Sequence, residues 1–321
     1  MEERIVRKQK DENKKKKPSM LFYIYTIVTL LAIISAMTAA TYAWFTGSQT
    51  VDTNRVTAET SGDKDVKLLV STDGSFKDGS NSTTDGNNGG LSDGDTPDKT
   101  NGSTCSIKQV NKADAEYLLP VSTSNLKTFL YNDHTVADMA KDFTQLKNEE
   151  HIYHGRFYIK AETGSSKPMK IYLSESKGTG GKMIVSSDPK VDKAARLGIV
   201  FNGDYSNPII LKLSENDGKK SDQIYNTVVD GKVLDGTKVL AMDGNKVSAV
   251  NDPSRMISDY VIDMTSGSVS IPEKPIYTLT PSKAVPVDVF FYLEGCDPDT
   301  SDKVKLDTTK MHLGFYGIIA D

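Results

Sequence analysis

Cysteine is scarce in this sequence. The 321-residue chain contains only Cys105 and Cys296, and no Cys-x-x-Cys pair occurs. A thiolate zinc site or a thioredoxin-like motif is therefore not supported. Both cysteines lie in the part of the chain that we expect to be exported, so one interpretation is a single disulfide that closes a very long loop in an oxidising exterior. The other is two separate, small and partly buried side chains.

Catalytic motifs are also missing. The four histidines, His134, His151, His154 and His312, do not form the His-Glu-x-x-His motif that places two zinc ligands on one face of a helix. The nearest approach to it is the segment 149–154. If this segment begins a strand, a spacing of three sends the imidazoles of His151 and His154 to opposite faces, so we interpret both as surface or edge histidines.

The sequence has no Gly-x-Ser-x-Gly elbow for a nucleophilic serine, and no glycine-rich loop that leads into a helix and can cradle phosphate. Cys105 lies beside a polar tract without a local motif for a catalytic thiol. We therefore expect a protein without enzymatic activity, catalytic residues or a cofactor.

Charge is distributed unevenly. The formal net charge is -4, but residues 1–20 hold eight basic and four acidic side chains, about +4, which leaves about -8 for the remainder. Binding to a phosphate backbone requires clustered Lys and Arg, so the acidic remainder argues against nucleic acid as a partner.

The N-terminal segment has the order of a signal peptide, with basic residues first and an apolar stretch from Met20 to Phe45 second. The stretch is also long enough to cross a bilayer as a helix, which takes about 20 residues. Because the basic cluster stays inside, either a cleaved or an uncleaved segment sends the C-terminal part outward.

Small residues near the end of this stretch suit a signal peptidase. Thr41 and Ala43 occupy the -3 and -1 positions if cleavage falls between Ala43 and Trp44, and Thr38 with Ala40 offers a second register. The alternative is an uncleaved anchor in which the aromatic residues of this region lie at the membrane interface.

The string from Ala39 to Thr46, AATYAWFT, resembles the signal-peptide ending of the camelysin/TasA-like exported proteins of Firmicutes. That resemblance implies cleavage near Ala43 by a signal peptidase of the SipW type. We expect residues 1–43 to be a basic region plus signal peptide or membrane anchor, and residues 44–321 to be an exported domain at the cell surface or outside the cell.

Most of the exported part has the pattern of short strands. Residues 47–71 indicate two strands, and a tract rich in Gly, Ser, Asp, Asn and Thr at about 72–104 indicates a polar surface loop. Further segments of five to ten residues, rich in Ile, Val, Tyr, Phe and Leu, predict strands at 117–123, 156–161, 170–174, 196–201, 208–213, 238–242, 260–264, 285–294 and 311–319.

One helix is expected among these strands. Thr135 can cap it, and Val136, Met139, Phe143 and Leu146 recur at helical spacing, which predicts a packing helix over 135–146. Many short strands with period-two alternation predict an all-β, mainly antiparallel sandwich or jelly roll with one or two short helices, preceded by an N-terminal apolar helix.

Two strand segments extend the resemblance. Residues 289–298, VFFYLEGCDP, resemble a strand followed by the motif "EGxDP" near the C-terminus of related exported proteins, and Ala195–Ile199 resembles their "alRvg" strand. The resemblance implies a jelly-roll domain that assembles into extracellular fibres.

Calcium is the one ion that the sequence suggests. Carboxylates gather in the polar tract and at the turn after residue 293, and calcium takes six or more oxygen ligands from such turns. The candidates are Asp93, Asp95, Asp98, Glu294, Asp297, Asp299 and Asp302. Neither group has EF-hand spacing, and Asp is an ordinary turn residue, so the turn interpretation is favoured.

These features support a structural or adhesive protein of the cell surface or biofilm matrix. It would meet the cytoplasmic membrane and a signal peptidase during export, and then other copies of itself or other surface proteins, by strand addition at a sheet edge or through residues 44–60. The alternative is a membrane-anchored ectodomain that binds a ligand or carbohydrate. A camelysin-like metallopeptidase is disfavoured by the missing zinc motif.

Overall fold

The computed structural model describes residues 55–60, 66–76, 103–111, 117–132, 143–147, 149, 151–164, 166–175, 183–186, 189–214, 228–229, 232–233, 236–262, 270–297, 299–300, 304–305 and 309–320. The chain divides into two units, 1–49 and 50–321, and the first lies outside the described residues. So do the predicted cleavage site and most of the polar tract. In the described ranges, no helix is long and apolar enough to cross a membrane.

Strands dominate the described part of the chain, which confirms the all-β prediction. The first of two large sheets has a central path of five strands, to which β11 (Ile184–Ser186) and β20 (Tyr277–Leu279) are added at the sides. The path runs β19 (Val261–Ile262), β10 (Met169–Ser174), β23 (Thr309–Ile319), β1 (Arg55–Thr60) and β3 (Ser103–Cys105).

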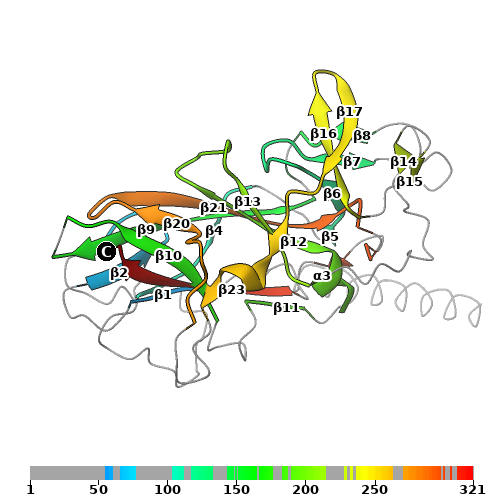
Figure 1. The fold of residues 1–321 in the computed structure, drawn as a ribbon. Helices are drawn as coiled ribbons and strands as arrows, with labels where there is room; N and C mark the ends of the chain where they lie inside the picture. Colours follow the sequence, from blue (N-terminus) through cyan, green and yellow to red (C-terminus); the bar gives the residue numbers. More distant parts are fainter. Residues whose placement is uncertain are drawn as a thin grey trace, which may run out of the picture. The chain divides into compact units, whose positions relative to one another are not determined.

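The second large sheet is built around two long strands, β21 (Ala284–Glu294) and β9 (Tyr153–Thr163), which pair with each other. From β21 the sheet continues on one side through β12 (Ala195–Phe201), β13 (Ile209–Lys212) and β18 (Arg255–Met256). It continues on the other side through β6 (Pro120–Ser122), β7 (Leu130–Asn132) and β8 (Phe143–Gln145), while β2 (Val66–Ser71) and β4 (Lys108–Gln109) pair with β9 (Figure 1).

Smaller elements complete the described fold. The hairpin of β16 (Lys238–Asp243) and β17 (Lys246–Asn251) is the longest of three two-stranded pairs. The others are β14 (Val228–Val229) with β15 (Lys232–Val233), and β5 (Tyr117–Leu118) with β22 (Val304–Lys305). Two short helices are described, α3 (Pro189–Ala194) and the 3-10 turn η2 (Ile257–Tyr260).

Most strand pairings are antiparallel, as predicted, but both large sheets are mixed. Parallel pairs join β1 to β23, β10 to β19, β13 to β18 and β21 to β6. The parallel pair of β1 and β23 joins the first and last described strands of the chain in one sheet.

The helix predicted over 135–146 is wrong where the structure describes it. Phe143–Gln145 forms β8, which pairs antiparallel with β7, and residues 133–142 lie outside the described residues. The apolar residues of this segment pack in two directions: Phe143 packs against the cluster of Leu130 and Leu240, and Leu146 against the cluster around Phe290. Pairing with the edge of β7 therefore outweighs the helical spacing of the sequence.

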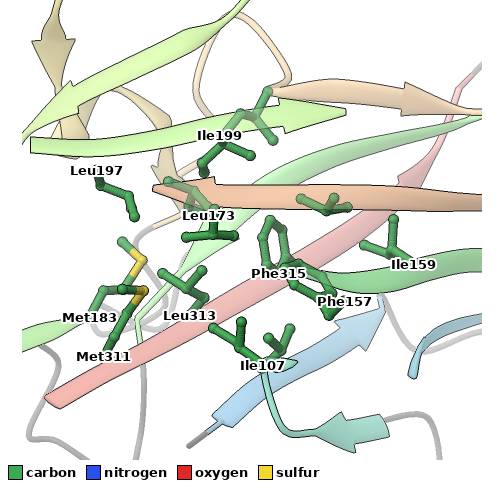
Figure 2. Close-up of a cluster of buried hydrophobic side chains, with 14 of the residues drawn as sticks. Ile107, Phe157, Ile159, Leu173, Met183, Leu197, Ile199, Met311, Leu313 and Phe315 are labelled. Carbon is green, nitrogen blue, oxygen red and sulfur yellow. The ribbon is translucent and has the colours of Figure 1, made fainter. Parts of the chain in front are cut away.

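The main core lies between the two large sheets. Every second residue of β21, namely Val285, Val287, Val289, Phe291 and Leu293, is buried in it. Figure 2 shows Phe157 of β9 beside Phe315 of β23, with ring centroids 5.6 Å apart. Period-two alternation thus identifies the core face of β21 correctly.

The opposite face of β21 is buried too, which simple alternation does not predict. Phe290 and Tyr292 of β21 are fully buried there, in a second apolar cluster that includes Phe129 from the segment between β6 and β7. Asp288 and Glu294 share this face and are only 2% exposed. Charged side chains therefore lie inside the protein along the outer face of the second sheet.

Candidate functional site

Buried charged and titratable side chains form two groups along this face. We call Arg196, Asp252, Glu294 and Asp297 the Arg196 cluster, and Glu149, His154, Arg156 and Asp288 the His154 cluster. Arg196, Glu294, Asp297, Asp288 and His154 are buried, whereas Glu149 and Arg156 are 39% and 40% exposed at the edge of their cluster. Burying a charge is costly unless a partner compensates it, so the partners decide what each cluster does.

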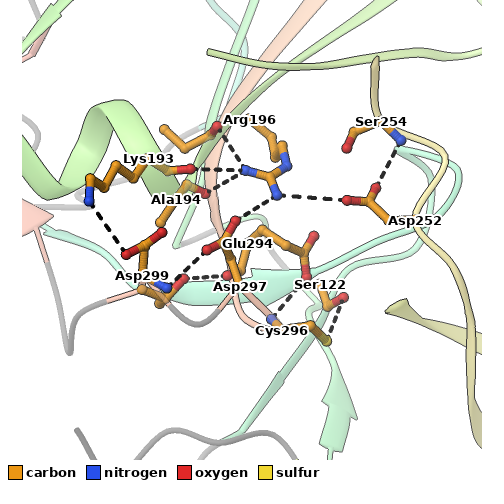
Figure 3. Close-up of polar contacts among 12 residues, drawn as sticks. Ser122, Lys193, Ala194, Arg196, Asp252, Ser254, Glu294, Cys296, Asp297 and Asp299 are labelled. Atoms are coloured by element: carbon orange, nitrogen blue, oxygen red, sulfur yellow. Dashed lines mark hydrogen bonds and ion pairs between the residues drawn. The ribbon is translucent and has the colours of Figure 1, made fainter. Parts of the chain in front are cut away.

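In the Arg196 cluster, the guanidinium of Arg196 joins three elements. Its Nη2 donates a hydrogen bond to Oδ2 of Asp297 at 2.8 Å, in the turn after β21, and lies 3.7 Å from Oδ2 of Asp252, after β17. Its Nη1 donates to backbone carbonyl oxygens at the end of α3, including that of Ala194 at 3.3 Å (Figure 3). Arg196 therefore ties β12, the β16–β17 hairpin and the end of β21 together.

The sequence builds this meeting point through strand register and turn chemistry. Arg196 lies opposite Tyr292 in the β12–β21 pair, and Tyr292 precedes Glu294 by two residues. The turn that follows is closed by Asp297, whose backbone N–H donates to the carbonyl oxygen of Glu294 at 3.1 Å and whose Oδ1 accepts from the N–H of Asp299 at 2.9 Å. An Asp that accepts from the backbone two residues on is a common turn former.

Glu294 is the most strongly perturbed carboxyl group of the cluster. Its burial raises its pKa to about 8, against the opposing effect of the Arg196 charge, although its Oε1 accepts a 3.1 Å hydrogen bond from the N–H of Cys296. Glu294 is therefore protonated at neutral pH. The cluster then contains one cation, Arg196, and the carboxylates of Asp297 and Asp252.

The predicted calcium candidates divide between described and undescribed residues. Glu294, Asp297 and Asp299 do meet at one turn, but Arg196 binds Asp297, and the Nζ of Lys193 lies 3.8 Å from Oδ1 of Asp299. Among the residues that the structure describes, no group of three or more His, Cys, Asp or Glu side chains is placed to hold a metal ion. Asp93, Asp95, Asp98 and Asp302 lie outside the described residues.

The two cysteines belong to different parts of the fold. Cys105 ends β3 and packs against the main core, whereas Cys296 is buried with Leu130 and Leu240 in a third cluster, with its Sγ 3.5 Å from Oγ of Ser122. No disulfide joins them. The interpretation as two separate small side chains therefore describes this structure, and the bridged one does not.

The His154 cluster is built on β9 and β21. The Nδ1 of His154 lies 2.7 Å from Oε2 of Glu149, and its Nε2 lies 3.1 Å from Oδ1 of Asp288. The imidazole stacks on Phe290 with a centroid distance of 4.2 Å. Arg156 donates from Nε and Nη2 to the two carboxylate oxygens of Asp288, at 2.7 and 3.0 Å.

The electrostatics of this cluster favour the charged imidazolium. Burial lowers the pKa of His154, but the hydrogen bonds to Asp288 and Glu149 outweigh it, so the net shift is upward. Burial raises the pKa of Asp288, and the hydrogen bonds from His154 and Arg156 outweigh it, so the net shift is downward. In this charged form both ring nitrogens carry a proton, so neither presents a lone pair to a metal ion.

A backbone clamp holds the segment that carries Glu149. The Nδ2 of Asn111 donates to the carbonyl oxygens of Glu149 and Ile152 at 2.9 and 2.7 Å, and its Oδ1 accepts from the N–H of His154 at 3.3 Å. His151 lies before β9, with its ring 5.4 Å from that of Tyr131. The prediction of a surface or edge position is wrong for His154, because β21 and Glu149 bury it.

Sequence reasoning missed both clusters, although one signal was present. The strand ARLGIVF contains a single charge among apolar residues, and a lone charge in a fully buried strand requires a buried partner. Its partner is 101 residues away and is brought close by strand register together with the turn after β21. Comparison of the chain with protein-family models, with curated proteins and with solved structures finds no match.

Proposed function

We propose that this chain is an exported, non-enzymatic structural protein of the cell surface or biofilm matrix, similar to the camelysin/TasA-like proteins. In this proposal residues 44–321 form a jelly-roll domain that assembles into fibres. The single observation that carries the proposal is the position of β1, the first described strand after the predicted cleavage site.

β1 fills an interior position of the first sheet. It pairs in parallel with β23 from Arg55↔His312 to Thr60↔Gly317, and antiparallel with β3. Val56 and Ala58 are fully buried on its inner side. Without β1, β23 and β3 would expose backbone donors and acceptors along a long slot, and a strand from a second copy has the right sequence to fill it.

Cleavage near Ala43 would free the segment that leads into β1, so that β1 of one molecule can insert between β23 and β3 of the next. The buried clusters are consistent with a structural role because their charges pair with one another and cross-link strands. Those pairs keep the rest of the domain rigid while β1 exchanges.

A membrane-anchored ectodomain is the second candidate, and the length of the apolar run from Met20 to Phe45 favours it. Mass spectrometry of the N-terminus of the protein recovered from producing cells distinguishes the two candidate functions. A mature chain that begins at Trp44, together with fibres in electron micrographs, supports the proposal. An intact segment in the membrane fraction, with dispersed monomers, supports the anchored ectodomain.

A further inference from the structure

The buried polar atoms that have no hydrogen-bond partner among the described residues include Nε of Arg196, Oη of Tyr292 and Oε2 of Glu294, which lie in and beside the Arg196 cluster. The three residues are at most 2% exposed. A buried polar atom that lacks a partner costs roughly 1–3 kcal/mol, and native proteins rarely leave several such atoms together. These atoms therefore indicate a hydrogen-bonding group that the described residues do not supply.

The three side chains share one face of the second sheet. Arg196 and Tyr292 are direct partners across the antiparallel β12–β21 pair, which places their Cβ atoms about 4.5–5.5 Å apart. Glu294 follows Tyr292 by two residues and so projects from the same face of β21. The pKa of the Tyr292 phenol is raised well above its ordinary value by burial and by its proximity to Glu294.

We propose that Nε of Arg196, Oη of Tyr292 and Oε2 of Glu294 form an internal water site, in which ordered water hydrogen-bonds to these three side chains. Water fits because Nε–H of Arg196 is a donor, the phenol of Tyr292 can donate or accept, and Glu294 accepts when ionised and donates when protonated. A buried water typically makes about three such bonds.

Charge excludes the two obvious alternatives. A cation would face the N–H of a guanidinium that is already a fixed positive charge. An anion would add a negative charge beside the carboxylates of Asp297 and Asp252, which already outnumber the single cation. A neutral ligand that both donates and accepts avoids both penalties, and water is the smallest such group.

The test uses the complete, unmodified protein and does not depend on the proposed surface function. In solution, the Nε–H proton of Arg196 is expected to show a nuclear Overhauser cross-peak to a long-lived water. In a crystal soaked with bromide, ordered density is expected within hydrogen-bonding distance of the three atoms, without anomalous signal. Bromide at the site, a metal ion there, or direct bonding of the three groups to other protein atoms would overturn the proposal.

A matched pair of variants locates the water by its partners. Tyr292→Phe removes only the phenol oxygen, so the cross-peak from Arg196 to water is expected to weaken as the water exchanges faster. Tyr260→Phe is the control, because its phenol accepts a 2.7 Å hydrogen bond from Arg255 outside the cluster. An equal loss of the Arg196 cross-peak in both variants would contradict the assignment.

Discussion

The Nη2 of Arg196 donates a 2.8 Å hydrogen bond to Oδ2 of Asp297, 101 residues later in the chain, and both side chains are almost fully buried. The pair joins β12 to the turn that follows β21. A pair at this depth stabilises the fold only while both members are present.

Asp297→Ala is therefore expected to lower the free energy of unfolding by about 3–5 kcal/mol, because it leaves the buried guanidinium of Arg196 without its closest carboxylate. Urea denaturation measures this loss. Glu162→Gln is the control, since its ion pair with Lys160 is partly exposed and should contribute less than about 1 kcal/mol. Equal costs in the two variants would show that the Arg196 pair is not a special element of the fold.

Glu294 should make stability depend on pH in the neutral range. Its folded pKa of about 8 is above its ordinary value of 4.5, so the folded state binds a proton that the unfolded chain has lost between these values. The free energy of unfolding should therefore fall as pH rises from about 5 to about 8, by up to about 1.4 kcal/mol per pH unit, and then level off.

Glu294→Gln should remove this part of the pH dependence, because the amide does not titrate. The measurement is the urea midpoint of both proteins across the same pH series. Parallel curves for the wild-type protein and the variant would contradict a protonated Glu294 in the folded state.

His154 should stay protonated at a pH where an exposed histidine is neutral. Its pKa is raised, so its contribution to stability is fully present below pH 6.5 and is lost as pH rises through the folded value. Nitrogen NMR of the imidazole is expected to show both Nδ1 and Nε2 protonated above that pH. A single protonated nitrogen at pH 6.5 would contradict the assignment.

Asp288 should affect the free energy of unfolding at acidic pH. Its pKa is lowered, so its stabilising contribution is present above pH 3.8 and disappears as pH falls through the folded value. Asp288→Asn is expected to flatten the acid limb of the stability curve and to lower stability at neutral pH. An unchanged acid limb would indicate that other carboxyl groups control acid unfolding.

The two residue periods of the sequence have different predictive value here. Alternation along 285–294 and 311–319 identified β21 and β23, because a period of two fixes which side chains face the main core. The helical spacing of Phe143 and Leu146 predicted a helix incorrectly, because residues 143–145 pair with the edge of β7 as strand β8. The burial of the outer face of β21 depends on the segment 123–129 folding over it, which local sequence cannot reveal.

The candidate site was harder to predict than the fold. Glu294 and Asp297 stood out in the sequence as turn carboxylates. Arg196 and Asp252, the residue after β17, are brought close to them only by long-range strand pairing, which the local sequence does not reveal. The protonation of Glu294 likewise depends on burial by residues far away in the chain.

A charge on β1 should act differently on its two faces. Ala58→Asp places a carboxylate in the main core and is expected to abolish both the insertion of β1 and fibre assembly, whereas Thr57→Asp, one residue earlier and partly exposed, should allow both. Circular dichroism melts and electron microscopy of the two variants test this. Fibres formed by Ala58→Asp would exclude β1 as the exchanging strand.

The most direct test of the proposed assembly follows β1 from one molecule to the next. Thr57 and Thr104 are partners in the β1–β3 pair. One variant carries Thr57→Cys and the other Thr104→Cys, both in a background with Cys105→Ser and Cys296→Ala. The two variants are mixed and allowed to assemble under oxidising conditions. Chains with Lys67→Cys and Glu162→Cys, partners in the β2–β9 pair, form the matched control. Strand exchange predicts disulfide-linked dimers of the Thr57 and Thr104 variants and none in the control, whereas monomers alone in both mixtures would contradict it.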